Sequence, residues 1–171
     1  MITDGGGREV EISPATAGDV PALVETQIRA FHDDARRFGL AVGGGEPGGP
    51  PGYDSPAWQA KMMSIGRYYA IRLEGSVIGG MIVFARGADR LNLGRIWIDP
   101  DFQNLGIGRA AIDYLHRVVG PGCVWTLDTP AWAIRNHHVY ESTGYRKVGE
   151  QATPNGWVEY LYERPAQPAA G

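Results

Sequence analysis

Residues 94–109 read GRIWIDPDFQNLGIGR, and this stretch decides the fold. Its first half is apolar and predicts a β-strand that ends near Pro100, because proline cannot continue a hydrogen-bonded strand. After a short loop, Gly106 and Gly108 open a segment with the apolar spacing of a helix. The unpaired N–H groups at a helix start bind phosphate, and glycine lets the backbone approach the ligand. Gln103–Gly108 therefore predicts a diphosphate-binding turn.

Two other kinds of phosphate site have glycine-rich turns of similar sequence. This turn is not a Walker loop, because no Lys-Ser or Lys-Thr pair follows its glycines. It nearly matches a dinucleotide fingerprint, since Gly106–Ala111 reads G-x-G-x-x-A and Asp128 lies about twenty residues further on. However, Gly106 is six residues beyond Pro100, where a tight turn is required, and only 43 residues follow Asp128 to complete a doubly wound sheet. An NAD-type dinucleotide is therefore the less favoured ligand.

The strand before the turn changes its hydrophobic phase. Leu91 and Leu93 follow one period-2 phase, and Ile96 and Ile98 follow the other. The slip at residues 94–95 predicts a β-bulge, which accommodates one extra residue and is frequent beside active sites. A strand that is buried on both faces is the alternative, because phase then carries no information.

The rest of the chain predicts elements in the order β-α-α-β-β-β-α-β-α-β-β. Antiparallel hairpins flank one strand–helix–strand crossover, so we expect an α/β (α+β) fold with a mixed, mostly antiparallel sheet. It should have about seven strands and about four helices. The expected helices are 20–31, 55–65, 107–119 and 133–143, and the expected strands are 10–13, 68–73, 77–85, 91–98, 123–127, 145–151 and 157–163.

Composition excludes several classes of protein. The formal net charge of −3 and the pI near 5.8 disfavour a nucleic-acid-binding surface. The chain has no apolar run of about 18 residues and no signal-peptide pattern, so we expect no membrane contact and a cytoplasmic location. The single cysteine, Cys123, makes no metal-ligand spacing and is expected in the core, and we expect no metal.

Glycine and proline concentrate near the two ends of the chain and at 43–52. A chain of 171 residues with 43% hydrophobic content is long enough for one core. We therefore expect a single domain over residues 8–164, flexible termini at 1–7 and 165–171, and a mobile loop at 43–52.

The stretch Gly94–Arg109 resembles the signature of the GCN5-related N-acetyltransferases, the GNAT superfamily. Their hallmark is Q/R-x-x-G-x-G/A after a strand that ends near a proline, and it is matched here by Gln103, Gly106 and Gly108. Asn136–Tyr145, which reads NHHVYESTGY, resembles the helix-to-strand segment of the same family. The resemblance implies the acyl-CoA N-acyltransferase fold with a splayed parallel strand pair, and element order extends it over Arg8–Arg164.

The resemblance also implies how acetyl-CoA is held. In such proteins pantetheine lies between the splayed strands like an added strand. A backbone N–H near Ile98 would polarise the thioester carbonyl, as an oxyanion hole does. The implied cofactor-binding residues are Ile96, Trp97 and Ile98 for pantetheine, and Gln103, Asn104, Leu105, Gly106, Ile107, Gly108 and Arg109 for the diphosphate, with Arg109 adding a charge-assisted contact.

Tyr140 resembles the family tyrosine that donates a proton to the departing CoA thiolate. A phenol with a pKa of about 10 is protonated at neutral pH and can donate as the thiolate forms. An ordinary amphipathic tyrosine on a helix is the alternative. Many family members carry an asparagine seven residues before this tyrosine, where this chain has Ala133. Asn136 lies one turn before Tyr140 on nearly the same helix face and is the expected cofactor contact.

The implied reaction is acetyl transfer from acetyl-CoA to a primary amine in a ternary complex. A small-molecule amine is favoured over a protein N-terminus or lysine, and its site should be walled by about 31–58 and the turn 152–157. No general base is evident, so water or Asp128 would accept the proton. Dimers are common on this fold, so a homodimer is among the expected partners.

Several polar residues near these motifs have ordinary explanations. His137 and His138 point about 100° apart on a helix, and we expect solvated or helix-end histidines. The acidic residues around the loop could attract a cationic amine, although acidic surface residues are usually just solvated. They are Asp33, Asp34, Glu46 and Asp54. The rival to an enzyme is a non-catalytic acyl-CoA-binding or regulatory domain, which would keep the turn and not need Tyr140.

Overall fold

The computed structural model describes residues 1–38, 48–154 and 156–168. The chain divides into two compact units, Met1–Ile82 with Arg95–Ile107 and Val83–Gly94 with Gly108–Gly171. Of the loop predicted at 43–52, residues 43–47 lie outside the described residues, and Glu46 is among them.

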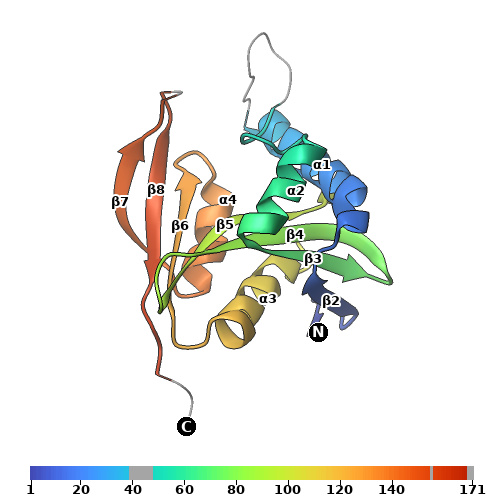
Figure 1. Ribbon diagram of the computed structural model, residues 1–171. Helices are drawn as coiled ribbons and strands as arrows, with labels where there is room; N and C mark the ends of the chain where they lie inside the picture. Colours follow the sequence, from blue (N-terminus) through green and yellow to red (C-terminus); the bar gives the residue numbers. More distant parts are fainter. Residues whose placement is uncertain (39–47, 155, 169–171) are drawn as a thin grey trace. The chain divides into compact units, whose positions relative to one another are not determined.

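The first unit places two helices on one face of its strands (Figure 1). Gln27 of the first helix donates to Gln59 of the second at 2.9 Å, and Tyr68 of the following strand donates to the same Gln59 oxygen. All three side chains are buried, so this amide–phenol cluster joins the three elements. The unit contains β1 (Ile2–Thr3), β2 (Glu9–Pro14), η1 (Ala17–Asp19), α1 (Val20–Arg37), α2 (Pro56–Ile65), β3 (Arg67–Leu73), part of β4 (Ser76–Ala85), part of β5 (Arg90–Ile98) and η2 (Pro100–Phe102).

The starts of α1 and α2 follow their sequence signals. Thr16 and Asp19 form a capping box, because the Thr16 N–H donates to Asp19 Oδ2 at 2.8 Å across η1, just before α1. Ser55 caps α2, accepting a hydrogen bond from the Trp58 N–H at 3.2 Å. A turn joins β3 to β4 at Glu74-Gly75, where the φ values are 50° and 81°, as a tight two-residue hairpin turn requires.

The second unit packs helices against β6 and β8 through aromatic side chains. Trp125 of β6 and Tyr145 are fully buried, and both rings contact His116. The helix predicted at 107–119 is α-helical only to Tyr114 and ends in a π-helical turn before Gly120. The unit contains most of α3 (Ile107–Tyr114), η3 (Leu115–Val119), β6 (Val124–Pro130), α4 (Ile134–Ser142), β7 (Arg146–Ala152) and β8 (Val158–Arg164).

The strands form one mixed sheet in the order β1-β2-β3-β4-β5-β6-β8-β7. β5 and β6 pair in parallel over Arg90–Asn92 and Val124–Thr126, and β2–β3, β6–β8 and β7–β8 are antiparallel. The predicted fold class is confirmed. The described part of the chain has eight strands rather than about seven, because β1 was not predicted: two residues are too short to show a period.

Burial along β5 bears on the phase slip but does not decide it. Leu91, Leu93, Trp97 and Ile98 are buried, and Ile96 is half-buried. Adjacent Trp97 and Ile98 are both buried, so the end of this strand is covered on both faces. The β-bulge stays a prediction.

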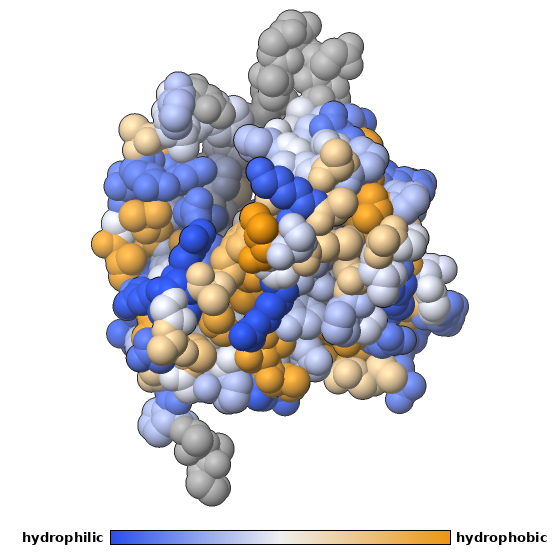
Figure 2. Space-filling view, viewed as in Figure 1, coloured by the Kyte–Doolittle hydropathy of each residue, from blue (hydrophilic) through white to orange (hydrophobic). Residues whose placement is uncertain are grey.

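The described residues hold neither a membrane-spanning helix nor a cluster of metal-ligand side chains. In the described ranges, no helix is long and apolar enough to span a membrane. No group of three or more His, Cys, Asp or Glu residues in those ranges could hold a metal ion. On the face drawn in Figure 2, hydrophobic residues lie among hydrophilic ones. Cys123 is half-buried just before β6, so the prediction of a core cysteine is wrong.

Candidate functional site

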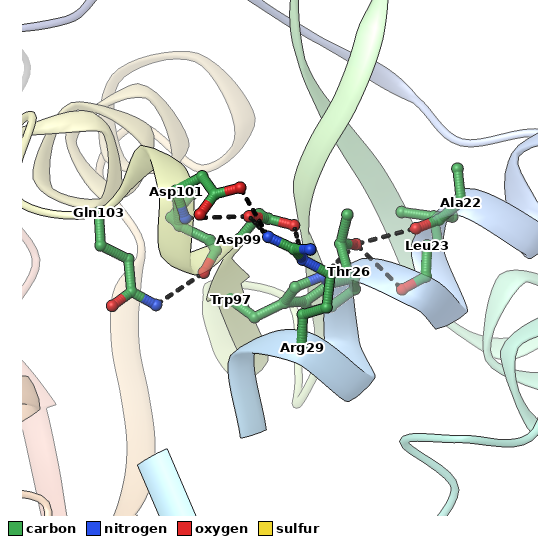
Figure 3. Close-up of polar contacts among 9 residues, drawn as sticks. Ala22, Leu23, Thr26, Arg29, Trp97, Asp99, Asp101 and Gln103 are labelled. Carbon is green, nitrogen blue, oxygen red and sulfur yellow. Dashed lines mark hydrogen bonds and ion pairs between the residues drawn. The ribbon is translucent and has the colours of Figure 1, made fainter. Parts of the chain in front are cut away.

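Asp99 anchors the turn after β5 to helix α1 (Figure 3). Arg29 of α1 donates to both of its carboxylate oxygens, from Nε to Oδ2 at 2.8 Å and from Nη2 to Oδ1 at 3.1 Å. Arg29 also donates to Asp101 at 2.7 Å, and the Asp101 N–H donates back to Asp99 Oδ1 at 3.0 Å. This bidentate pair holds the first residues of the turn against α1.

Gln103 closes the turn from its other end. Its side-chain Nε2 donates to the carbonyl oxygen of Ile98 at 2.8 Å (Figure 3). The bond spans the whole of η2, so the hallmark glutamine has a structural role in shaping the turn. Its direct contact with a cofactor stays a prediction.

The centre of the turn has the backbone conformation of an anion site. Asn104 and Gly106 have φ values of 61° and 75°, and both are exposed. Left-handed residues in a turn direct neighbouring N–H groups into one concavity, which suits an anion. The Leu105 carbonyl accepts from the Gly5 N–H at 2.7 Å, so the N-terminal segment supports the turn. Arg109 is exposed on the first turn of α3, and the binding of a diphosphate here stays a prediction.

The strand segment predicted to hold pantetheine uses its largest side chain for packing. Trp97 is buried, and its Nε1 donates to Thr26 Oγ1 of α1 at 3.0 Å. Its ring meets Tyr68 edge-on with centroids 6.0 Å apart, and a Cβ on Gly80 would lie 2.6 Å from it. Trp97 could therefore serve a cofactor only through its backbone, as predicted also for Ile96 and Ile98.

Tyr140 lies in α4, within the second unit. It is buried, and its ring centroid is 6.1 Å from that of Tyr145 and 6.2 Å from that of Tyr162. Asn136 is half-buried one turn earlier, and its N–H donates to the Ala133 carbonyl at 2.9 Å. The catalytic role of Tyr140 and the cofactor contact of Asn136 stay predictions.

His137 differs from its expected solvated state. It is buried, its Nε2 lies 3.0 Å from the Pro130 carbonyl, and its ring lies beside those of Tyr160 and Tyr162. A carbonyl only accepts, so Nε2 carries the proton. Sequence spacing could not show this, because the partner is in β6. His138 is exposed, as expected.

His116 is a buried polar residue that belongs to none of the sequence motifs. Its Nε2 lies 3.1 Å from the Tyr145 hydroxyl. Burial lowers the pKa of His116 to about 3 and raises the pKa of Tyr145 above its ordinary value. The histidine is thus neutral in the fold, and its spacing of four residues from Ile112 was the available signal.

The acidic residues considered as bases or amine attractants have varied surroundings. Desolvation, and then the nearby Glu159 carboxylate, raise the pKa of Asp128, although the residue is exposed at the surface, where solvent weakens both effects. Asp33 pairs with Arg37 Nε at 2.6 Å, which compensates its charge, and Asp54 is exposed. The attraction of a cationic amine by the acidic residues around the loop stays a prediction.

Comparison with known proteins gives a family match. The family model described as an acetyltransferase (GNAT) domain matches residues 64–147, which include β5, the turn and α4. No curated protein sequence matches the chain.

Solved structures share the fold. The ribosomal-protein-S18-alanine N-acetyltransferase from Escherichia coli has a TM-score of 0.68 and 21% identity, with 95% of this chain and 97% of that chain covered. The PaiA N-acetyltransferase from Thermoplasma acidophilum, in complex with coenzyme A, has a TM-score of 0.71 and 13% identity, with 92% and 99% covered. A spermidine N-acetyltransferase chimera from Vibrio cholerae has a TM-score of 0.66 and 13% identity, with 91% and 95% covered.

At these sequence identities, the similarity to the solved structures shows the fold alone. Together with the domain match and the turn of Gln103–Gly108, they lead to one assignment. The chain belongs to the GCN5-related N-acetyltransferase (GNAT) superfamily.

Proposed function

We propose that the protein transfers an acetyl group from acetyl-CoA to a primary amine of a small molecule, by direct attack in a ternary complex. The observation that carries this proposal is the turn before α3, where Asn104 and Gly106 adopt left-handed conformations in an exposed backbone. Such a turn suits a diphosphate, and the family match supports CoA as its source.

The cofactor would be held almost entirely by backbone groups. The segment Ile96–Ile98 would pair with the pantetheine amides, and residues 104–109 would donate to the diphosphate. Gln103 and Asp99 would keep the turn in shape through the contacts described above. Asn136 would add a contact from α4. When bound, acetyl-CoA supplies a reactive acetyl thioester.

Two groups of the chain would assist the reaction. A backbone N–H near Ile98 donates a hydrogen bond to the carbonyl oxygen as its negative charge develops. The Tyr140 hydroxyl gives its proton to the sulfur as the carbon–sulfur bond breaks and the carbon–nitrogen bond forms. Water or Asp128 takes the proton that the amine must lose, and the raised pKa makes Asp128 a stronger base than an ordinary aspartate.

Related structures support two classes of acceptor. One acts on an alanine of ribosomal protein S18 and another on spermidine, so both polypeptides and small amines are known acceptors on this fold. We favour a small amine. The proposal involves no nucleic acid, membrane or metal, and it keeps a cytoplasmic location and a homodimer as expectations from the sequence.

Replacing the tyrosine tests the catalytic role. Tyr140→Phe removes only the hydroxyl, so kcat for acetyl transfer should fall by about 100-fold or more while the Kd for acetyl-CoA holds. The activity assay is thiol release with a panel of amines. Tyr114→Phe is the control, because Tyr114 is a half-buried helical tyrosine of the same unit with no proposed role.

The same measurement separates the enzyme from its rival. If Tyr140→Phe turns over like the unmodified protein, the role given to Tyr140 is wrong. If the protein binds acetyl-CoA but releases no thiol with any amine, a non-catalytic acyl-CoA-binding or regulatory domain is the better description.

A further inference from the structure

Arg95 on β5 makes hydrogen bonds only to neutral oxygens among its recorded partners. Its Nη1 donates to Gln27 Oε1 at 3.2 Å, and its Nη2 donates to the Pro51 carbonyl at 3.1 Å. Other arginines of the same unit are paired with carboxylates. Arg8 pairs with Asp4, Arg29 with Asp99 and Asp101, Arg37 with Asp33, and Arg72 with Asp19.

The surroundings of Arg95 disfavour an uncompensated charge. Burial lowers its pKa to about 10, and an electrostatic interaction with Tyr68 opposes this shift. Within residues 1–38, 48–154 and 156–168, no carboxylate pairs with its guanidinium. A half-buried cation of this kind gains most from an anion that arrives with a ligand.

Aromatic rings hold the guanidinium in place. Its carbon lies 4.4 Å from the ring centroid of Trp58 and 5.8 Å from that of Phe31. A guanidinium that lies over a ring still presents N–H groups along its edge, and that edge matches the two oxygens of a carboxylate. The side chain is therefore positioned before any ligand binds.

The position of Arg95 links it to the acceptor. It directly precedes Ile96–Ile98, the segment proposed to hold pantetheine. Its partners Phe31, Pro51 and Trp58 belong to the region 31–58 that the sequence predicts as a wall of the acceptor site.

We propose that Arg95 binds a carboxylate of the acceptor, so that the substrate class is an amine that also carries a carboxylate, as free amino acids do. This inference rests on the proposed acetyl transfer. A polyamine would be repelled by the same guanidinium. The N-terminal residue of a polypeptide offers a neutral peptide carbonyl where the free amino acid has a carboxylate, and it would bind more weakly.

A binding experiment tests the inference without relying on turnover. The probes are the proteinogenic L-amino acids and their α-carboxamides, which differ in the carboxylate alone. Thermal shifts are measured with the full chain at saturating CoA. We expect at least one amino acid to bind about 10- to 100-fold more tightly than its carboxamide, the range for a charge-assisted hydrogen bond. Thiol release with acetyl-CoA should rank the pair in the same order.

Variants show whether Arg95 is responsible. Arg95→Gln should remove the preference for the carboxylate while the Kd for acetyl-CoA stays unchanged, and Arg95→Lys should restore part of it. Arg36→Gln is the matched control, because it removes one exposed positive charge from α1 and should keep the preference. If Arg95 had a purely structural role, Arg95→Gln would weaken the binding of the amino acids and of their carboxamides equally.

The outcomes of the two proposals are distinguishable. If the protein acetylates amines but binds each acid no better than its carboxamide, the inference is overturned and acetyl transfer stands. If an acid is preferred in binding through Arg95 but no thiol is released, the carboxylate site stands and acetyl transfer fails. If Arg95→Gln does not fold, equal binding of acid and carboxamide to Arg95→Lys and to the unmodified protein still overturns the inference.

Discussion

At the turn before α3, Asn104 and Gly106 adopt left-handed backbone conformations. Gly106 has φ 75°, and a Cβ placed on it would meet no atom within 4 Å outside its immediate neighbours. The glycine is therefore required for its left-handed conformation, since no neighbouring atom excludes a larger residue.

Gly106→Ala should lower the affinity for acetyl-CoA by about 10-fold or more and cost about 1 kcal/mol of stability. Gly75→Ala is a matched control, because Gly75 has φ 81° and equally open space but lies in the β3–β4 turn. It should cost similar stability and leave affinity unchanged. Isothermal titration and urea unfolding measure both quantities, and equal affinity losses would contradict a phosphate site at Gly106.

His116 should make the protein sensitive to acid. The folded state holds its pKa near 3, while the unfolded chain has an ordinary pKa of about 6.5. The unfolded state therefore binds more protons between these values, and stability falls by up to roughly 1.4 kcal/mol per pH unit as pH drops through this window.

His116→Gln removes this titration, so its urea midpoint should fall less steeply between pH 7 and about pH 5 than that of the unmodified protein. His138→Gln is the control, because His138 is exposed, and its slope should match that of the unmodified chain. If the urea midpoint of His116→Gln depends on pH as steeply as that of the unmodified protein, other groups cause the acid sensitivity.

At the scale of elements, α1 and the turn after β5 depend on one another. The side chain of Asp99 is only 9% exposed and receives two hydrogen bonds from Arg29, whereas that of Asp101 is 74% exposed. The buried carboxylate should therefore carry most of the coupling between the helix and the turn.

Asp99→Asn should cost about 1–2 kcal/mol of stability, after allowance for the exposure of Arg29, and should also weaken acetyl-CoA binding. Asp101→Asn should change stability by less than about 0.5 kcal/mol. Urea unfolding and acetyl-CoA titration of the two variants decide the matter. If both variants lose similar stability and affinity, the exposed Arg29–Asp101 pair contributes as much as the buried Arg29–Asp99 pair.

Elements with local signals were predictable from the sequence. The Thr16–Asp19 capping box, the Ser55 cap and the Glu74–Ser76 turn all lie where their residues suggest, because each depends on contacts between near neighbours. The π-helical end of α3 and the strand β1 were missed. Neither leaves a periodic pattern long enough to recognise.

At the scale of the whole molecule, ligand binding should raise thermal stability through linkage. Acetyl-CoA at about 100 times its Kd adds about 2.7 kcal/mol, which for a chain of this size raises Tm by roughly 5–10 °C. NAD should give no shift. Differential scanning fluorimetry with both ligands provides the comparison. If NAD alone raises Tm, the turn is a dinucleotide site and not a CoA site.

The sequence by itself determined the element order, the position of the turn and its glycines, because these follow from local backbone preferences and short-range periodicity. The tertiary structure decided which side chains meet across long separations. In the fold, the Gln103 side chain donates to the Ile98 carbonyl and the His137 ring to the Pro130 carbonyl. Arg95 donates to Gln27 and lies over the Trp58 ring. Such partners are chosen by the packing of distant segments, and no spacing along the chain encodes them.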